Sequence, residues 1–187
     1  MEAALLVLAH KGGLDPGTAT EALPRLAEIP FDAAHKFMAT FHQENDQVRM
    51  FVKGAPDVLL ALCTQVLNAN TQGAEGAEVA GGPLDVAARQ LIEAHYTELG
   101  NQGLRGLLVA SRNIPDSAFD ASGDLAAWVR DLSFVGLIGL MDPPRAEAKV
   151  AIAECRAAGV TVKMITGDHQ LTASAIAAEL GLKGKAM

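Results

Sequence analysis

The chain has 187 residues, of which 50% are hydrophobic and 20% are charged, and its formal net charge at pH 7 is -7. These values exclude a disordered chain and allow one complete domain with part of a second. The sequence has no cluster of lysine and arginine, which argues against a nucleic-acid-binding protein. The two cysteines and five histidines lack metal-ligand spacing, so we expect reduced thiols and neither a zinc site nor a disulfide framework.

Neither a signal peptide nor a membrane span is expected. The N-terminus carries Glu2 in place of the basic and apolar regions of a secretory signal. The longest apolar run, residues 132–141, has about half the length of a membrane-spanning helix. Its composition favours a buried strand instead.

The first part of the chain predicts one helix and a β-hairpin. Residues 2–10 are apolar all round and predict a buried helix. Two prolines bound a short extended piece, 24–31, that ends at an aromatic residue. Residues 36–41 and 48–52 alternate as strands do, and residues 43–47 are expected to form the turn between them.

The strand at 48–52 leads into a turn that carries one cation. Lys53 follows the strand, Gly54 allows the chain to turn, and Pro56 suits the first position of a helix predicted to reach about residue 67. A lysine beside a helix N-terminus is a favourable place for phosphate oxygens. Taken alone, these residues are also typical of an ordinary strand, turn and helix with a solvated lysine.

The middle of the chain predicts a surface loop and then a mixture of helices and strands. In chain order these are the loop 68–83, a helix 84–99, a strand 104–111, a short helix around Trp128 and a strand 132–140. The loop contains no Gly-x-x-x-x-Gly-Lys-Ser/Thr sequence, so it is not a phosphate-binding loop of that type.

A change of pattern at residues 142–145 predicts a domain boundary, because two successive prolines remove two backbone donors. A helix 146–158, a strand 160–165 and a helix ending at Leu180 are expected to follow, which is the pattern of a parallel α/β sheet. Ligands of such sheets lie at the carboxyl ends of strands, where Thr166 stands. Asp168 there is equally suited to capping the last helix.

Four motifs in this order make the chain resemble the nucleotide-binding part of a P-type cation-transporting ATPase of the calcium-pump-like branch. The motifs are Lys53-Gly54-Ala55-Pro56, Gly103-Leu104-Arg105, Asp142-Pro143-Pro144-Arg145 and Met164-Ile165-Thr166-Gly167-Asp168-His169. The resemblance implies an α/β (α+β) fold in two parts. Residues 1–140 would form the nucleotide-binding domain, a twisted antiparallel sheet with flanking helices. Residues 141–187 would form part of a haloacid-dehalogenase-like phosphorylation domain, joined to the first by a hinge at 142–145.

The resemblance also implies an ATP site. Phe31 would stack on adenine, Glu2 would accept a hydrogen bond from the adenine amino group, and Arg105 would reach the phosphates. Without the resemblance, Phe31 is typical of a core residue, and Lys36 and Arg105 of solvated strand ends. The complete set of implied nucleotide-binding residues is Glu2, Phe31, Lys36, Lys53, Gly54, Arg105, Asp142, Arg145, Thr166, Gly167 and Asp168.

In the second part, Thr166 and Asp168 would support phosphoryl transfer, with Gly167 adding a backbone donor. Asp142 and Arg145 would approach the nucleotide when the domains close, although the same residues suit a rigid two-proline linker. The basic residues that the family often places around the lysine of the segment 31–38 are absent, because Ala33, Ala34 and Phe37 occupy those positions. This absence predicts a reduced affinity for ATP.

Two family motifs are missing from the sequence, namely the phosphorylated Asp-Lys-Thr-Gly-Thr and the magnesium-binding Gly-Asp-Gly-x-Asn-Asp. Phosphoryl transfer needs the nucleophile and the metal together. We therefore expect an ATP-binding cytoplasmic fragment of a cell-membrane pump, which positions ATP and Mg²⁺ for phosphorylation of an aspartate outside this chain and hydrolyses nothing alone. Its partners would be the phosphorylation, actuator and membrane domains of the parent pump.

Two alternatives stay open at this point. A haloacid-dehalogenase-like phosphatase would fit the Thr166 segment but needs an Asp-x-Asp nucleophile, and the sequence has no such pair after a strand. A non-catalytic interaction domain that keeps the fold would bind no nucleotide.

Overall fold

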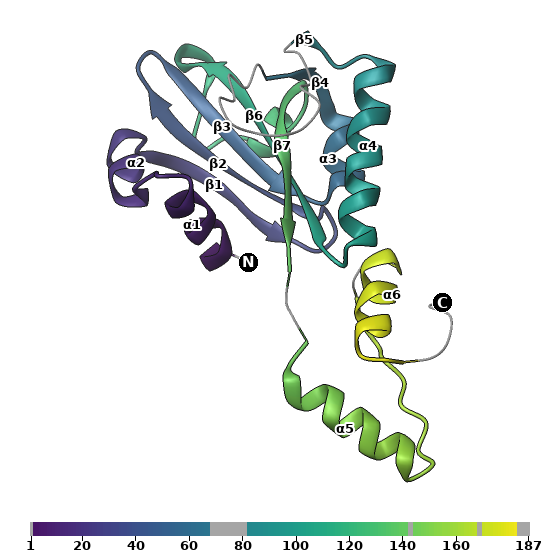
Figure 1. The fold of residues 1–187 in the computed structure, drawn as a ribbon. Coiled ribbons are helices and arrows are strands. Elements are labelled where there is room, and N and C mark those ends of the chain that lie inside the picture. Colours follow the sequence, from purple (N-terminus) through teal and green to yellow (C-terminus); the bar gives the residue numbers. More distant parts are fainter. Residues whose placement is uncertain (1, 68–81, 142–143, 168–169, 183–187) are drawn as a thin grey trace. The chain divides into compact units, whose positions relative to one another are not determined.

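The computed structural model describes residues 2–67, 82–141, 144–167 and 170–182 (Figure 1). Contacts divide the chain into two units, one of residues 1–90 and 107–138, the other of residues 91–106 and 139–187. The helices are α1 Glu2–Lys11, α2 Pro16–Ala22, α3 Pro56–Leu62, α4 Val86–Asn101, α5 Ala146–Ala157 and α6 Gln170–Glu179, with short 3₁₀ helices η1 Asp116–Ala118 and η2 Leu125–Trp128. The strands are β1 Arg25–Asp32, β2 Phe37–Glu44, β3 Gln47–Gly54, β4 Cys63–Val66, β5 Gly82–Pro83, β6 Arg105–Pro115 and β7 Leu132–Leu140.

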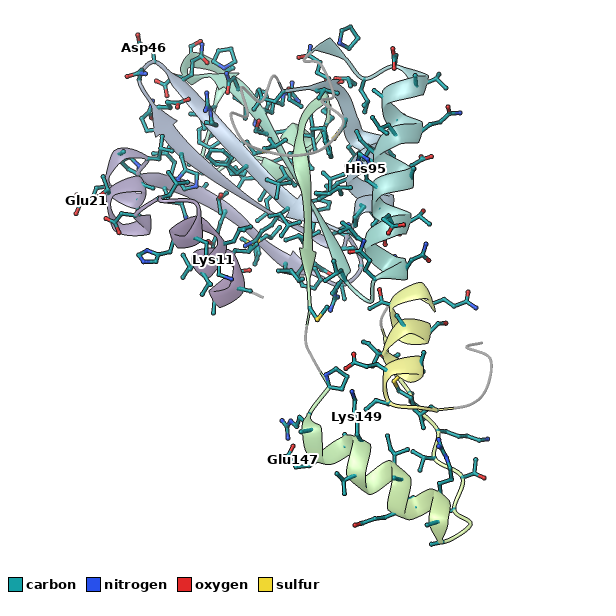
Figure 2. The ribbon with its side chains drawn as sticks, viewed as in Figure 1. Lys11, Glu21, Asp46, His95, Glu147 and Lys149 are labelled. Atoms are coloured by element: carbon teal, nitrogen blue, oxygen red, sulfur yellow. The ribbon has the colours of Figure 1, made fainter. Side chains whose placement is uncertain are left out.

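The described strands form one seven-stranded sheet in the order β1-β2-β3-β6-β7-β4-β5 (Figure 1). The pairs β1–β2, β2–β3, β3–β6 and β4–β5 are antiparallel, whereas β4 and β7 are parallel. The predicted hairpin is β2–β3, and Asp46, labelled in Figure 2, lies in its turn. The expected mixed α/β architecture with a largely antiparallel sheet is therefore confirmed.

In strands β2, β3 and β6, one face of the sheet is apolar and the other face also carries polar side chains. Successive side chains of a strand point to opposite faces. The buried face, called the core face below, carries Ala39, Phe41, Val48, Met50, Val52, Leu108, Ala110 and Ile114. The opposite face carries Met38 opposite Lys53 and Thr40 opposite Phe51, and it is called the cleft face below.

The segment between β6 and β7 covers part of the core face. The Phe119 ring lies 5.2 Å from that of Phe41, and the Arg112 guanidinium lies 5.4 Å from the centre of the Trp128 ring. Arg112 also donates to the carbonyls of Trp128 and Arg130, at 3.1 and 2.8 Å. The short helix predicted around Trp128 is confirmed as η2.

The predicted helix from Pro56 to about residue 67 is too long. Helix α3 ends at Leu62, and the next four residues form β4, which pairs with β7. The Arg89 guanidinium of α4 donates to the carbonyls of Leu60 and Cys63, at 2.6 and 3.2 Å. The Leu60 carbonyl also accepts from the backbone N–H of Cys63, which closes the last turn of α3. The pairing of β4 with β7, a strand far along the chain, thus sets a boundary that the local sequence did not reveal.

The prediction that residues 2–10 form a buried helix is correct for the helix and wrong for the burial. Helix α1 has no buried residue, and Leu6 and Val7 are 56% and 53% exposed. One side of α1 faces the sheet, and the other side is open in the described structure. Among the described residues, no helix is long and apolar enough to cross a membrane.

Helix α2 was not predicted from the sequence. Its N-cap, Asp15, accepts hydrogen bonds from the backbone N–H groups of Gly17 and Thr18 and from the Thr18 hydroxyl. The Thr18 hydroxyl bond is the main cause that lowers the pKa of the Asp15 carboxyl. Asp15 followed by proline is a helix-start signal, and the short helix it opens packs beside α1.

The second unit contains helices α5 and α6 but not the strand expected between them. Residues 160–165 pair with none of the described strands, and Val160 and Ile165 are 56% and 97% exposed. A strand is stable only when a neighbouring strand satisfies its backbone groups, and here no described strand does so. An ion pair joins the two helices: Nζ of Lys149 in α5, labelled in Figure 2, lies 3.1 Å from Oε1 of Glu179 in α6. The predicted strand is therefore wrong, and the haloacid-dehalogenase-like unit is not established.

Burial makes the two cysteines unequal, and we predict different reactivities. Cys63 is 1% exposed, its Sγ donates to the Leu59 carbonyl at 3.2 Å, and burial raises its pKa to about 11. Cys155 is partly exposed. At pH 8 iodoacetamide should therefore modify Cys155 within minutes and leave Cys63 unmodified until the chain unfolds, because the thiolate is the reacting form. Mass spectrometry of timed samples measures this, and equal rates at the two thiols would contradict it.

Candidate functional site

A cleft of about 750 Å³ lies in the first unit, between α1 and the cleft face of the sheet. Its walls are mainly apolar, with Leu5 and Leu8 from α1 and Met38, Phe51, Val109 and Ile138 from the sheet. Its polar lining residues are Glu2, Arg25, Thr40 and Lys53. A volume of this size, with apolar walls and few polar groups, is typical of a site for a small organic molecule.

Lys53 and Glu2 form an ion pair in the cleft. Lys53 is the residue before the last of β3, and its side chain is only 21% exposed, whereas that of Glu2 is 69% exposed. In the sheet, Lys53 lies opposite Met38 on one side and Val109 on the other. The Lys53 ammonium thus lies among apolar neighbours of the sheet, and the Glu2 carboxylate of α1 lies beside it.

Gly54 fixes how the end of β3 meets the preceding turn. A Cβ atom added at Gly54 would lie 2.5 Å from the Lys36 carbonyl oxygen and 2.6 Å from Cβ of Phe37. Lys36 adopts a positive φ of 59°, its N–H donates to the Asp32 carbonyl, and its own carbonyl accepts from Ala55. Only glycine permits this approach of two backbones.

Phe31 lies near the end of β1, just before the turn that carries Lys36. Phe31 is 64% exposed, so the interpretation of this residue as a core phenylalanine is wrong. The Lys36 ammonium lies 3.3 Å from the Asp57 carboxylate, and both side chains are more than half exposed. Neither Phe31 nor Lys36 lines the cleft, although Lys36 adjoins Gly54 through the backbone.

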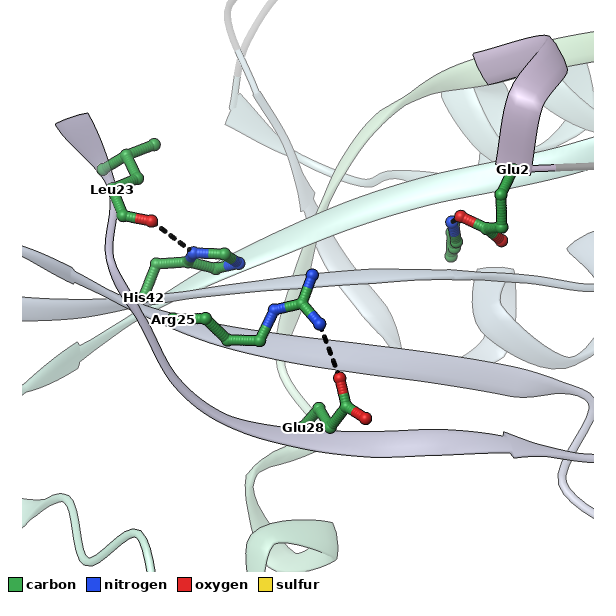
Figure 3. A network of polar contacts seen from close by, with 6 residues as sticks. Glu2, Leu23, Arg25, Glu28 and His42 are labelled. Atoms are coloured by element: carbon green, nitrogen blue, oxygen red, sulfur yellow. Dashed lines mark hydrogen bonds and ion pairs between the residues drawn. The ribbon is translucent and has the colours of Figure 1, made fainter. Parts of the chain in front are cut away.

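A second group of polar residues lies further along the cleft face. Arg25 donates to Glu28 at 2.6 Å, and Nδ1 of His42 lies 2.8 Å from the Leu23 carbonyl (Figure 3). The His42 ring meets the Phe51 ring edge-on at 5.6 Å. Sequence analysis missed Arg25 and Thr40, although the alternation of Met38, Thr40 and His42 along one strand could have indicated a shared face.

The remaining predicted residues belong to the second unit. Arg105 opens β6, Arg145 precedes α5, and Thr166 and Gly167 follow the segment that was expected to be a strand; all four are exposed. Asp142 and Asp168 lie outside the described residues. The structure therefore brings together Glu2, Lys53, Gly54 and the backbone of Lys36. The role of every predicted residue beside a nucleotide stays a prediction.

A metal site was not predicted within this chain. In the part of the chain that the structure describes, no three histidine, cysteine, aspartate or glutamate side chains lie together as metal ligands would. The charged side chains that line the candidate cleft belong to ion pairs, Lys53 with Glu2 and Arg25 with Glu28.

Comparison with known proteins gives the family. The family described as "P-type ATPase, cytoplasmic domain N" matches residues 1–147. The chain is 36% identical over 167 residues to the sodium/potassium-transporting ATPase subunit alpha-2 of Bos taurus, with 85% of this chain and 16% of the relative covered. It is 39% identical over 181 residues to the probable cation-transporting ATPase F of Mycobacterium tuberculosis, with 97% and 19% covered. The chain thus spans less than a fifth of these relatives' length. By the extent of the family match, the chain belongs to the P-type ATPases and carries their cytoplasmic N domain.

Proposed function

We propose that the cleft binds the adenine part of ATP and that, within a whole P-type ATPase, this chain positions ATP for phosphorylation of an aspartate outside it. The observation that carries the proposal is the Lys53–Glu2 pair in a mainly apolar cleft. The family match and the relatives' names, which describe ATPases, support it.

The chemistry of adenine suits this arrangement. Its faces are apolar, and Met38, Phe51 and Val109 offer apolar surface on the sheet. Its amino group is a hydrogen-bond donor, and the Glu2 carboxylate has capacity to accept from it as well as from Lys53. Lys53 then acts as a positioning residue, because it holds the carboxylate in the cleft and offsets its charge.

The phosphates would leave the cleft toward exposed polar groups. Lys36 is 54% exposed and lies beside Gly54, and its pair with Asp57 is of the exposed kind that opens at little cost. Phe31, also exposed, would stack on the outer face of adenine. Arg105, Arg145, Thr166 and Asp168 would approach the phosphates only when the second part closes on the first.

Mg²⁺ is expected to accompany ATP in this family. The ion would be held mainly by ATP oxygens and by groups outside this chain. Transport across a membrane, and calcium as the transported ion, remain parts of the proposal. The two relatives are named for sodium and potassium and for cations without further detail.

The test is a titration with ATP, ADP and AMP, without and with Mg²⁺, followed by NMR chemical shifts. We expect similar affinities for the three nucleotides, because adenine is the common anchor. Lys53→Gln should weaken all three by about tenfold, since it removes a charged hydrogen bond from the site. Lys149→Gln is the matched control, because Lys149 also pairs with a glutamate but lies in the second unit.

Two outcomes would count against the proposal. Absence of chemical shift changes at millimolar nucleotide would favour the non-catalytic interaction domain. Equal effects of Lys53→Gln and Lys149→Gln would show that nucleotide binds somewhere other than the cleft.

A further inference from the structure

The cleft is longer than the part that the Lys53–Glu2 pair occupies. Along β3, Lys53 and Arg49 are four residues apart, and Arg49 lies opposite His42, which in turn lies opposite Arg25. Strands rise by about 3.4 Å per residue, so these two rows of the sheet are separated by roughly 13 Å. Arg25 lines the cleft together with Leu14 and Thr40. Two cations therefore mark separate regions of one apolar cleft.

We infer that the Arg25 region is a second binding site, which takes a small organic anion with a flat apolar body and one carboxylate or sulfonate group. The anionic group would lie on the Arg25 guanidinium, and the apolar body against Phe51 and Leu14. This inference does not rest on nucleotide binding, because it uses neither Lys53 nor Glu2.

Arg25 is able to take such a ligand. Its Nη1 donates to Glu28, while its other terminal nitrogen points away from that carboxylate (Figure 3). A guanidinium presents parallel donors that match the two oxygens of a carboxylate. The side chains of Arg25 and Glu28 are 56% and 48% exposed, so solvent screens their attraction and the pair opens at little cost.

The floor of this region is aromatic and held in place. The His42 and Phe51 rings lie edge to face with their centres 5.6 Å apart. Nδ1 of His42 is fixed by the Leu23 carbonyl (Figure 3). Because a carbonyl oxygen only accepts, Nδ1 carries the hydrogen in this contact. Phe51 lines the same cleft as Arg25, and an aromatic wall favours a ligand with a flat body over a compact inorganic anion.

The Glu28 carboxylate competes with the ligand for the Arg25 guanidinium. Substitutions of Arg25 and Glu28 should therefore have opposite effects on binding of the anion. Arg25→Gln removes the cation and should weaken binding of the anion by about tenfold. Glu28→Gln leaves the guanidinium with one fewer competing acceptor and should strengthen binding by about threefold. A ligand of the same shape without charge should respond to neither substitution.

The experiment uses the full chain and two fluorescent probes, anilinonaphthalene sulfonate and its uncharged relative phenylnaphthylamine. Both are titrated into the unchanged chain, Arg25→Gln and Glu28→Gln. The matched controls are Arg49→Gln and Glu44→Gln, because Arg49 and Glu44 form a pair 2.8 Å apart on the same hairpin and neither lines the cleft. Unchanged NMR spectra away from the substituted residue exclude probe binding to an unfolded chain.

For the sulfonate probe, the expected result is a tenfold loss of affinity with Arg25→Gln, a gain of affinity with Glu28→Gln, and no change with either control. The affinity for the uncharged probe should not change in any variant. Equal losses with Arg25→Gln and Arg49→Gln would overturn the inference, as would equal responses of the charged and uncharged probes. If the chain does not bind nucleotide but the variants change sulfonate affinity as expected, only the proposed function is rejected. If nucleotide binds but the variants do not change sulfonate affinity, only the second site is rejected.

Discussion

Phe41→Ala is expected to lower the free energy of unfolding by about 3–5 kcal/mol, the largest change that we predict for this chain. The Phe41 side chain is 0% exposed on the core face, opposite Met50, and its ring packs against that of Phe119. Alanine would leave a cavity that neighbouring strands cannot close. Urea unfolding, followed by fluorescence of Trp128, measures the change in the unit that contains both rings.

Phe31→Ala is the matched control for this substitution. The two phenylalanines come from the paired strands β1 and β2, but Phe31 is 64% exposed. Its truncation should change the free energy of unfolding by no more than about 0.5 kcal/mol. In the nucleotide titration, the same variant should weaken binding if the ring stacks on adenine. Similar losses of stability for both variants would mean that the burial difference between the two rings is not real in solution.

Gly54→Ala is expected to lower the free energy of unfolding by about 1–3 kcal/mol, and Gly54→Val should lower it further. The new Cβ would meet the Lys36 carbonyl oxygen and Phe37, and both belong to the turn and strand that pair with β3, so backbone would have to move. The movement would also displace Lys53, the neighbour of Gly54. We therefore expect a weaker response to nucleotide in the same variant, measured by chemical shifts under conditions where it is folded.

Gly136→Ala provides the comparison, because it makes the same chemical change in a strand of the same sheet. A Cβ at Gly136 would meet nothing within 4 Å. Alanine there should be neutral or slightly stabilising, since it reduces the conformational freedom of the unfolded chain. Equal destabilisation of the two variants would indicate that loss of glycine itself, rather than the contact with Lys36, causes the effect at Gly54.

The two largest predictions share one piece of structure, the β2–β3 hairpin. Its core face holds Phe41 and its cleft face holds Lys53. A strand presents alternate residues to its two faces, so a one-residue shift of register would remove the hydrophobic side chains from the core and the cation from the cleft together. Stability of this sheet and position of the candidate site are therefore coupled, and binding measurements on destabilised variants need an accompanying measure of folding.

The candidate site was only partly predictable from the sequence. Lys53 and Gly54 were found because a strand, a glycine and a proline follow one another within the local chain. Arg25 and Thr40 were missed because their place in the cleft depends on the pairing of β1 with β2 and on the position of α1. The ion pair between Lys53 and Glu2 joins residues 51 positions apart, and local pattern carries no information about such a contact.

The sequence by itself determined the hairpin, most of the helices and the family, because periodicity, proline and glycine positions and short motifs are local properties. Only the tertiary structure decided where α3 ends, since the residues that follow it form β4 and pair with the distant strand β7. Only it showed that α1 is exposed and forms one wall of the cleft. It also showed that residues 160–165 lack a strand partner. These features depend on contacts between distant parts of the chain, and a hydrophobic segment has the same local pattern whether or not such a contact exists.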